Sequence, residues 1–124
     1  MNVALTNEED NADAVFESAA ELFSLLSSPI RLHIIHVLRD AELNVTQLLE
    51  VIDTTQPNIS QHLSLLYRTG ILGRKKSGAQ IYYRLKSKKV ELLCETVWLS
   101  SLAATSSSDS CQEHISPKNQ NLII

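Results

Sequence analysis

The sequence is poor in aromatic residues and in the residues that interrupt secondary structure. Only 5% of its 124 residues are aromatic, and it contains three glycines and three prolines. Because apolar residues make up 44% of the chain, its core must be built mainly from Leu, Ile and Val. A chain of this length is long enough for one domain with a single core.

Long apolar runs are also missing. None approaches the ~18–20 residues that a membrane-spanning helix needs, so we expect no membrane partner. Residues 1–13 are acidic and polar, which is the wrong charge for a secretory signal. With only Cys94 and Cys111, the chain has too little cysteine for a disulfide framework. These absences predict a cytoplasmic protein with reduced thiols.

Sequence motifs for catalysis are absent as well. The chain shows no Gly-rich phosphate loop, no Cys/His/Asp arrangement with a plausible oxyanion site, and no paired carboxylates in a predicted cleft. We therefore expect no enzymatic activity and no required cofactor.

The charged residues are segregated along the chain, although its net charge is only −3. Residues 1–27 carry six acids and no Lys or Arg, whereas residues 28–90 carry ten Lys and Arg against four Asp and Glu. A polyanion responds to the local field, which salt screens beyond roughly 8–10 Å, rather than to the net charge. The basic middle segment is therefore compatible with a nucleic-acid partner.

Apolar spacing and capping residues predict helices on both sides of a hairpin. We expect helices over residues 12–26, about 29–39, a short stretch capped by Thr46, about 56–69 and about 87–102. Two β-prone runs around residues 77–79 predict the hairpin. The fold class is thus mainly α with a β-hairpin wing: a winged helix-turn-helix.

Three segments follow from this pattern. Residues 1–11 lack periodicity and are predicted to be disordered. Residues 12–104 are predicted to form one winged-helix domain. The polar, Ser-rich stretch 105–124 is predicted to be a flexible C-terminal tail.

The helix expected at residues 56–69 has an outward face that contains no acid. Its apolar stripe, Ile59, Leu63 and Leu66, must face the core. Amides and hydroxyls can meet both phosphates and base edges, and Gln or Asn can pair bidentately with adenine. An ordinary solvated face mixes Glu and Lys instead. The predicted DNA-binding residues on this helix are Gln56, Asn58, Ser60, Gln61, His62, Ser64 and Arg68.

The predicted wing is basic. Arg74 and Lys76 lie on one arm, and Gln80 lies near the tip on the other. Contact with phosphates or with the minor groove is the natural use of such a hairpin. The alternative is an edge strand on which lysines only prevent aggregation.

Four segments together resemble the ArsR/SmtB family of winged-helix regulators. They read LLSSPIRL (residues 25–32), QPNISQHL (56–63), YRTGIL (67–72) and QIYYRL (80–85), and the resemblance covers about residues 15–102. The resemblance implies a homodimer whose first and last helices pair, and which binds a palindromic operator in double-stranded DNA. It also implies release of the operator when an inducer binds, often a metal ion or arsenite.

The sensor residues of that family are missing here. Arsenite sensors of the best-known type carry two thiols in the stretch that matches residues 42–47, which reads ELNVTQ in this chain. Zinc and nickel sensors use Asp and His along the last helix, which begins SKKVE at residues 87–91 here. His33 and His36 lie three residues apart, but a metal site needs a third partner that the sequence does not supply.

Cys94 and Cys111 are the remaining candidates for an inducer site. Thiolates bind soft ions such as As(III), and they also oxidise to a disulfide or react with sulfur species. Alternatively, Cys94 is a small core residue and Cys111 an idle thiol of the tail. The sequence leaves arsenite sensing, redox or reactive-sulfur sensing, and a purely structural role open.

The function predicted from the sequence is sequence-specific, inducer-responsive regulation of transcription. A winged helix that serves as a protein-interaction module without binding DNA is the alternative. Salt-dependent, sequence-selective binding to duplex DNA distinguishes the two.

Overall fold

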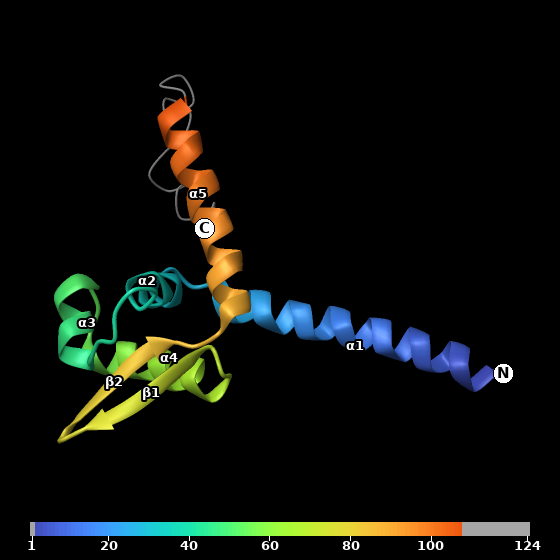
Figure 1. Ribbon diagram of the computed structural model, residues 1–124, viewed down its shortest axis with the longest axis horizontal. Coiled ribbons are helices and arrows are strands. Elements are labelled where there is room, and N and C mark those ends of the chain that lie inside the picture. Colours follow the sequence, from blue (N-terminus) through green and yellow to red (C-terminus); the bar gives the residue numbers. More distant parts are fainter. Residues whose placement is uncertain (1, 108–124) are drawn as a thin grey trace.

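Two long helices project from a cluster of shorter elements (Figure 1). The computed structural model describes residues 2–107 and, for residues 11–104, their side chains. In chain order the elements are α1 (Asn2–Leu26), α2 (Pro29–Val37), α3 (Val45–Val51), α4 (Gln56–Arg68), β1 (Leu72–Ser77), β2 (Gln80–Leu85) and α5 (Lys88–Ser107). This order is the predicted winged helix-turn-helix.

Helix α1 is longer than the sequence pattern predicted. It begins at Asn2, so the prediction that residues 1–11 are disordered is wrong for residues 2–11. Apolar periodicity stops near residue 12, but the sequence contains neither Gly nor Pro before Pro29, so nothing interrupts the backbone hydrogen bonds. The N-terminal half of α1 stands away from the other elements (Figure 1).

Local caps fix where α2 and α3 begin. The side chain of Ser28 accepts a hydrogen bond from the backbone N–H of Arg31, and Pro29 occupies the first turn of α2. Helix α3 is capped by Asn44, not by Thr46 as predicted. The Asn44 side chain accepts from the backbone N–H of Gln47 at 2.8 Å, while Gln47 accepts from the backbone N–H of Asn44 at 2.9 Å. This reciprocal pair is a capping box.

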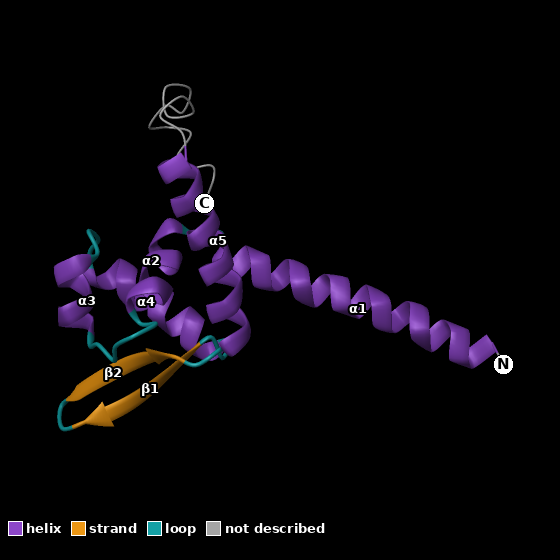
Figure 2. Cartoon of the chain, turned by 45° about the horizontal axis from the view of Figure 1, so that its top comes forward, coloured by secondary structure: helices purple, strands orange, loops and turns teal. Residues whose placement is uncertain are grey.

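The core lies where α4 packs against α2, α3 and β1 (Figure 2). Seven of its aliphatic side chains are completely buried: Ile34 and Ile35 from α2, Leu48 from α3, Ile59, Leu63 and Leu66 from α4, and Val90 from α5. No side chain within residues 11–104 is both buried and polar. The helices are therefore held together by apolar burial, worth about 1.5–3 kcal/mol for each large aliphatic side chain.

The wing is an antiparallel hairpin joined to the helical core by a short bridge. Leu72 pairs with Leu85 at its base and Ser77 with Gln80 at its tip, with Gly78 in the turn at φ +62°. Leu43 and Tyr83 exchange backbone hydrogen bonds of 3.1 and 2.8 Å, which attach β2 to the segment before α3. The wing is thus anchored at its base, whereas its tip extends into solvent (Figure 2).

Helix α5 extends to Ser107, beyond the predicted end near residue 102. The expected flexible tail began at residue 105, so residues 105–107 are helical instead; residues 108–124 lie outside the described part of the chain. The segment contains no Gly or Pro that would end the helix earlier. Among the described helices, none combines the length and hydrophobicity needed to cross a bilayer.

Candidate nucleic-acid interface

Helix α4 is fixed by its cap and by one buried stripe. The Thr55 side chain accepts a hydrogen bond from the backbone N–H of Asn58 at 3.3 Å. Ile59, Leu63 and Leu66 are fully buried, as the spacing predicted. Residues on the opposite side of the helix therefore face outward, and α4 also packs against β1 of the wing.

The predicted binding residues divide into two groups on this outer face. Gln56, Gln61, Ser64 and Arg68 are exposed, whereas Asn58, Ser60 and His62 are partly buried. Asn58 is engaged within the turn, since its Nδ2 donates to the hydroxyl of Thr54 at 2.8 Å. The exposed amide of Gln61 is thus better placed than Asn58 to reach another molecule.

His62 is held by a residue that the sequence did not single out. The Nε of Arg31 on α2 donates to Nδ1 of His62 at 3.1 Å, and Nη1 of Arg31 donates to the Leu25 carbonyl at 3.1 Å. Burial lowers the pKa of His62 below its ordinary value of 6.5, and the nearby positive charge of Arg31 lowers it further. His62 is therefore neutral at physiological pH and acts as a hydrogen-bond acceptor.

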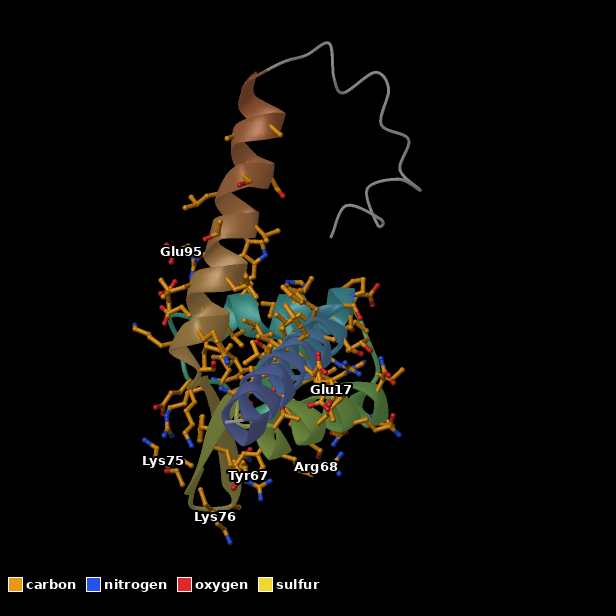
Figure 3. The ribbon with its side chains drawn as sticks, turned by 90° about the vertical axis from the view of Figure 1, so that its right-hand side faces the viewer. Glu17, Tyr67, Arg68, Lys75, Lys76 and Glu95 are labelled. Carbon is orange, nitrogen blue, oxygen red and sulfur yellow. The ribbon has the colours of Figure 1, made fainter. Side chains whose placement is uncertain are left out.

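The basic residues of the wing have different surroundings. The guanidinium of Arg74 lies over the ring of Tyr67 on α4, and Nζ of Lys75 forms an ion pair with Glu42 at 3.4 Å. Lys76 is exposed near the tip, and it points outward with Lys75 (Figure 3). In the same view Tyr67 and Arg68 lie at the side of the molecule from which the wing extends.

Gln80 and Arg84 lie on the second strand of the wing. Gln80 is exposed, and its side-chain oxygen accepts from Nδ2 of Asn44 at 3.4 Å. Arg84 lies across Gly73, where an added Cβ would come within 2.9 Å of its Cζ. The structure therefore brings the outer face of α4 and the basic wing to neighbouring surfaces.

Sequence reasoning missed two residues that organise this surface. Arg31 and Tyr67 were noted only as parts of motifs, yet each fixes a charged or polar side chain of the interface. Arg31 lies 31 residues from His62, so no helical or strand spacing relates them. Tyr67 follows the buried Leu66 on the exposed side of α4, and this exposed aromatic was a signal in the sequence.

A second surface, formed by α1 and α5, is apolar. Phe16, Phe23, Leu92 and Leu99 are 58–71% exposed. A cavity of about 690 Å³ lies between α1, α2 and α5, and its lining includes Phe23, Leu93, Cys94 and Trp98. Trp98 also packs edge-to-face against His36, with 4.5 Å between ring centres. This surface is separate from the outer face of α4.

Cys94 is buried, with 3% of its surface exposed. Desolvation raises the pKa of its thiol above 9.0, so the thiolate is disfavoured. Cys111, the other half of the predicted inducer site, lies outside the described residues. Among the side chains of residues 11–104 there is no group of three or more His, Cys, Asp or Glu that could hold a metal ion, and His33 and His36 belong to none.

Comparison with known proteins identifies the family. A family profile described as "Bacterial regulatory protein, arsR family" matches residues 28–73, from the cap of α2 to the start of β1. The transcriptional repressor PagR of Bacillus anthracis is 38% identical over 76 residues, which cover 60% of this chain and 76% of that repressor. The chain belongs to the ArsR family.

Two further relatives agree with this assignment. This ArsR-family chain is 34% identical over 71 residues to the HTH-type transcriptional repressor SmtB of Mycobacterium tuberculosis. That match covers 57% of this chain but only 53% of SmtB, so the chain matches about half of that relative's length. The crystal structure of the transcriptional regulator HlyU from Vibrio vulnificus superposes with a TM-score of 0.63 at 32% identity, covering 82% of this chain and 98% of HlyU.

These relatives also bear on two predictions from the sequence. Superposition on HlyU confirms the winged helix-turn-helix fold of this ArsR-family chain. PagR, SmtB and HlyU are described as transcriptional repressors or regulators, which confirms the prediction that this family member is not an enzyme.

Proposed function

We propose that this chain is a transcriptional repressor that binds duplex DNA with the outer face of α4. The observation that carries the proposal is the composition of this face. It exposes amide, hydroxyl and guanidinium groups and no carboxylate, while the opposite side of the same helix is fully buried. A helix of this kind can enter the major groove without repulsion from the phosphates.

Gln61 is the residue that we assign to base recognition. Its side chain is exposed in the middle of α4, between the turns that carry the buried residues Ile59 and Leu63. A glutamine amide has both a donor and an acceptor, so it can match N6 and N7 of adenine in one plane. Gln56 and Ser64 are also exposed, five residues before and three residues after Gln61.

The wing supplies affinity that does not depend on sequence. Lys76 is exposed near the tip, and Lys75 lies beside it. The ion pair between Lys75 and Glu42 is solvent-exposed, so its cost of rupture is small, about 0–1 kcal/mol, and a phosphate can replace the carboxylate. Lysines at such a position neutralise phosphates and release counterions.

A homodimer that reads a palindromic operator follows from the apolar surface of α1 and α5. Phe16 and Leu92 are 71% and 61% exposed. Leaving such apolar surface in contact with water is unfavourable, and monomeric proteins rarely expose large apolar patches. Pairing of α1 and α5 with the same helices of a second copy covers these side chains and places two copies of α4 at a fixed spacing. The operator then carries two inverted half-sites.

We also propose that Cys94 and Cys111 together sense an inducer. The inducer is As(III), an oxidant or a reactive sulfur species. The burial of Cys94 and the raised pKa of its thiol are the reverse of what a reactive thiolate needs. An inducer must therefore disturb the packing of α5 before it reaches this sulfur. Because α5 is part of the proposed dimer surface, such a disturbance changes the spacing of the two α4 helices.

DNA binding is tested by measuring affinity for a labelled duplex as the salt concentration rises from 50 to 200 mM. The Lys76→Ala variant is compared with Lys88→Ala, which removes the same charge at the start of α5, where Lys88 pairs with Glu91. We expect steep salt dependence for the wild type and a slope lower by about 0.9 for Lys76→Ala. Absence of duplex binding at 50 mM salt would favour the protein-interaction module instead.

Inducer sensing is tested separately, with reduced protein and without oxygen. As(III) is titrated into the protein–DNA complex in the wild type, Cys94→Ser and Cys111→Ser. Release of DNA from the wild type alone supports a site formed by both thiols. If both variants release DNA at the wild-type concentration of As(III), the cysteines are not the sensor. A hydrogen peroxide titration of the same three proteins distinguishes redox sensing.

A further inference from the structure

An open hollow of about 500 Å³ lies on α4 at its boundary with α2. Its lining consists of Arg31, Ser60, Gln61, His62, Ser64, Leu65 and Arg68. The two charged side chains are both arginines, and the other polar groups are two hydroxyls, an amide and an imidazole. Such a set offers many hydrogen-bond donors to an anion and no negative charge to repel it.

Arg31 is held in this hollow by two hydrogen bonds. Its Nε donates to Nδ1 of His62, and its Nη1 donates to the carbonyl oxygen of Leu25, each at 3.1 Å. Within residues 11–104, no hydrogen bond or ion pair is made by its Nη2. The guanidinium is therefore oriented by its surroundings, yet it keeps donors for another partner.

Arg68 provides a second cation at the same hollow. It lies on the outer face of α4, one helical turn after Ser64, and its Nε donates to the Ser64 carbonyl at 3.4 Å. The described residues supply no carboxylate partner for this arginine or for Arg31. Two guanidinium groups beside exposed Gln61 thus have no countercharge from residues 11–104.

We propose that this hollow binds one phosphate of the DNA backbone, with Arg31 as its main ligand and Arg68 and the hydroxyls of Ser60 and Ser64 beside it. This inference rests on the proposed DNA-binding function and adds Arg31 to the interface. Arginine suits the role because its planar fork donates two parallel hydrogen bonds to phosphate oxygens. A phosphate fixed here sets the position of α4 along the groove, and hence the base pair that Gln61 meets.

His62 is then a positioning residue and does not contact bases, in contrast to its place among the predicted DNA-binding residues. Its neutral Nδ1 is the acceptor that orients Arg31. A protonated His62 would have no lone pair at this nitrogen and would repel the guanidinium. The lowered pKa of His62 agrees with this arrangement, because both burial and Arg31 favour the neutral ring.

The phosphate assignment is tested by the salt dependence of binding in Arg31→Gln, on both the preferred duplex and a random duplex. We expect the slope of log K against log salt to fall by about 0.9 on both duplexes. Arg31→Lys keeps the charge but not the fork, so it keeps most of the slope and loses affinity. An unchanged slope in Arg31→Gln, with normal binding by the wild type, would overturn the inference while leaving the proposed function in place. Absence of salt-dependent binding in the wild type would overturn both.

The role of His62 is tested with two variants that differ in one acceptor. His62→Asn places an amide oxygen near the position of Nδ1, whereas His62→Leu has no acceptor. We expect His62→Asn to bind DNA within about threefold of the wild type and His62→Leu to bind at least about tenfold more weakly, since a bond to a charged donor is lost. Equal losses in both variants would mean that the imidazole itself contacts DNA.

A free anion is the competing occupant of the hollow. Inorganic phosphate is titrated into the DNA-free protein while the ¹⁵N resonances of the Arg31 Nε and the His62 ring are followed. We expect no saturation below millimolar phosphate, because a single open site lacks the neighbouring contacts that a duplex provides. Saturation at micromolar phosphate would assign the hollow to a small anion and overturn its assignment to DNA.

Discussion

The guanidinium carbon of Arg74 lies 4.0 Å from the centre of the Tyr67 ring. This contact joins the first strand of the wing to the last turn of α4, the two elements that form the candidate interface. Cation–π pairs at exposed positions are worth about 0.5–1 kcal/mol. Arg74 therefore contributes to the angle between wing and helix, while Lys76 near the tip remains available for phosphates.

Replacing Tyr67 by Leu removes this contact and keeps an apolar side chain. We expect the free energy of unfolding to fall by about 0.5–1 kcal/mol, measured by urea denaturation. Lys76→Ala is the control, since its side chain makes no ion pair within residues 11–104 and its removal should leave the urea midpoint unchanged. Equal midpoints for the wild type and Tyr67→Leu would show that Arg74 does not hold the wing.

The Gln61→Ala variant tests base recognition on α4. Gln61 is exposed and its side chain makes no hydrogen bond within the described part of the chain, so its truncation should leave stability unaltered. We expect a loss of about 1–3 kcal/mol in binding to the preferred duplex and little change on random DNA. Fluorescence anisotropy on both duplexes measures the difference. Equal losses on the two would show that Gln61 does not read bases.

The lowered pKa of His62 predicts a specific dependence of stability on pH. In the unfolded chain His62 takes up a proton near pH 6.5, whereas the folded protein takes it up only at lower pH. The unfolded state therefore binds more protons in this interval, and the free energy of unfolding falls as the pH decreases from about 6.5 through the folded pKa.

Urea denaturation between pH 5 and pH 8 measures this effect. The difference between the wild type and His62→Asn isolates the contribution of His62, because the two proteins share every other ionisable group. We expect the wild type to lose more stability than His62→Asn on acidification. Parallel pH profiles would contradict the contact between Arg31 and a neutral His62.

Burial of Cys94 predicts slow reaction of its thiol in the folded protein. The pKa is raised by desolvation, so the thiolate fraction at pH 7.5 is lower than for a free cysteine. In the Cys111→Ser variant, where Cys94 is the only thiol, we expect a disulfide reagent to react at least about tenfold faster in 8 M urea than in buffer. Equal rates would show that Cys94 is accessible as folded.

Much of the helical core was predictable because it depends on local spacing. Ile59, Leu63 and Leu66 recur at intervals of four and three residues, and all three are fully buried on α4. Gly70 follows the end of this helix, and its φ of +82° is one that residues with a Cβ rarely adopt. Periodicity and capping are properties of neighbouring residues, so the sequence shows them directly.

Other features depend on competition between local signals or on distant contacts. Thr46 was chosen as the cap of α3, but Asn44 with Gln47 three residues later makes a reciprocal cap that Thr46 cannot match. The pair formed by Arg31 and His62 and the bridge between Leu43 and Tyr83 join residues that are far apart in sequence. No spacing rule connects such residues, so the phosphate-binding hollow became evident only in the folded chain.

Selection of bound duplexes from a random-sequence pool, with the reduced chain of residues 1–124, shows whether two copies of α4 read a palindrome. We expect enrichment of two inverted half-sites with centres about 10–10.5 base pairs, or a multiple, apart. We also expect Gln61→Ala to lose the preference at one position in each half-site, while Lys76→Ala selects the same sequence with weaker binding. Enrichment of a single half-site, or of no sequence at all, would show that the chain does not read a palindrome as a dimer.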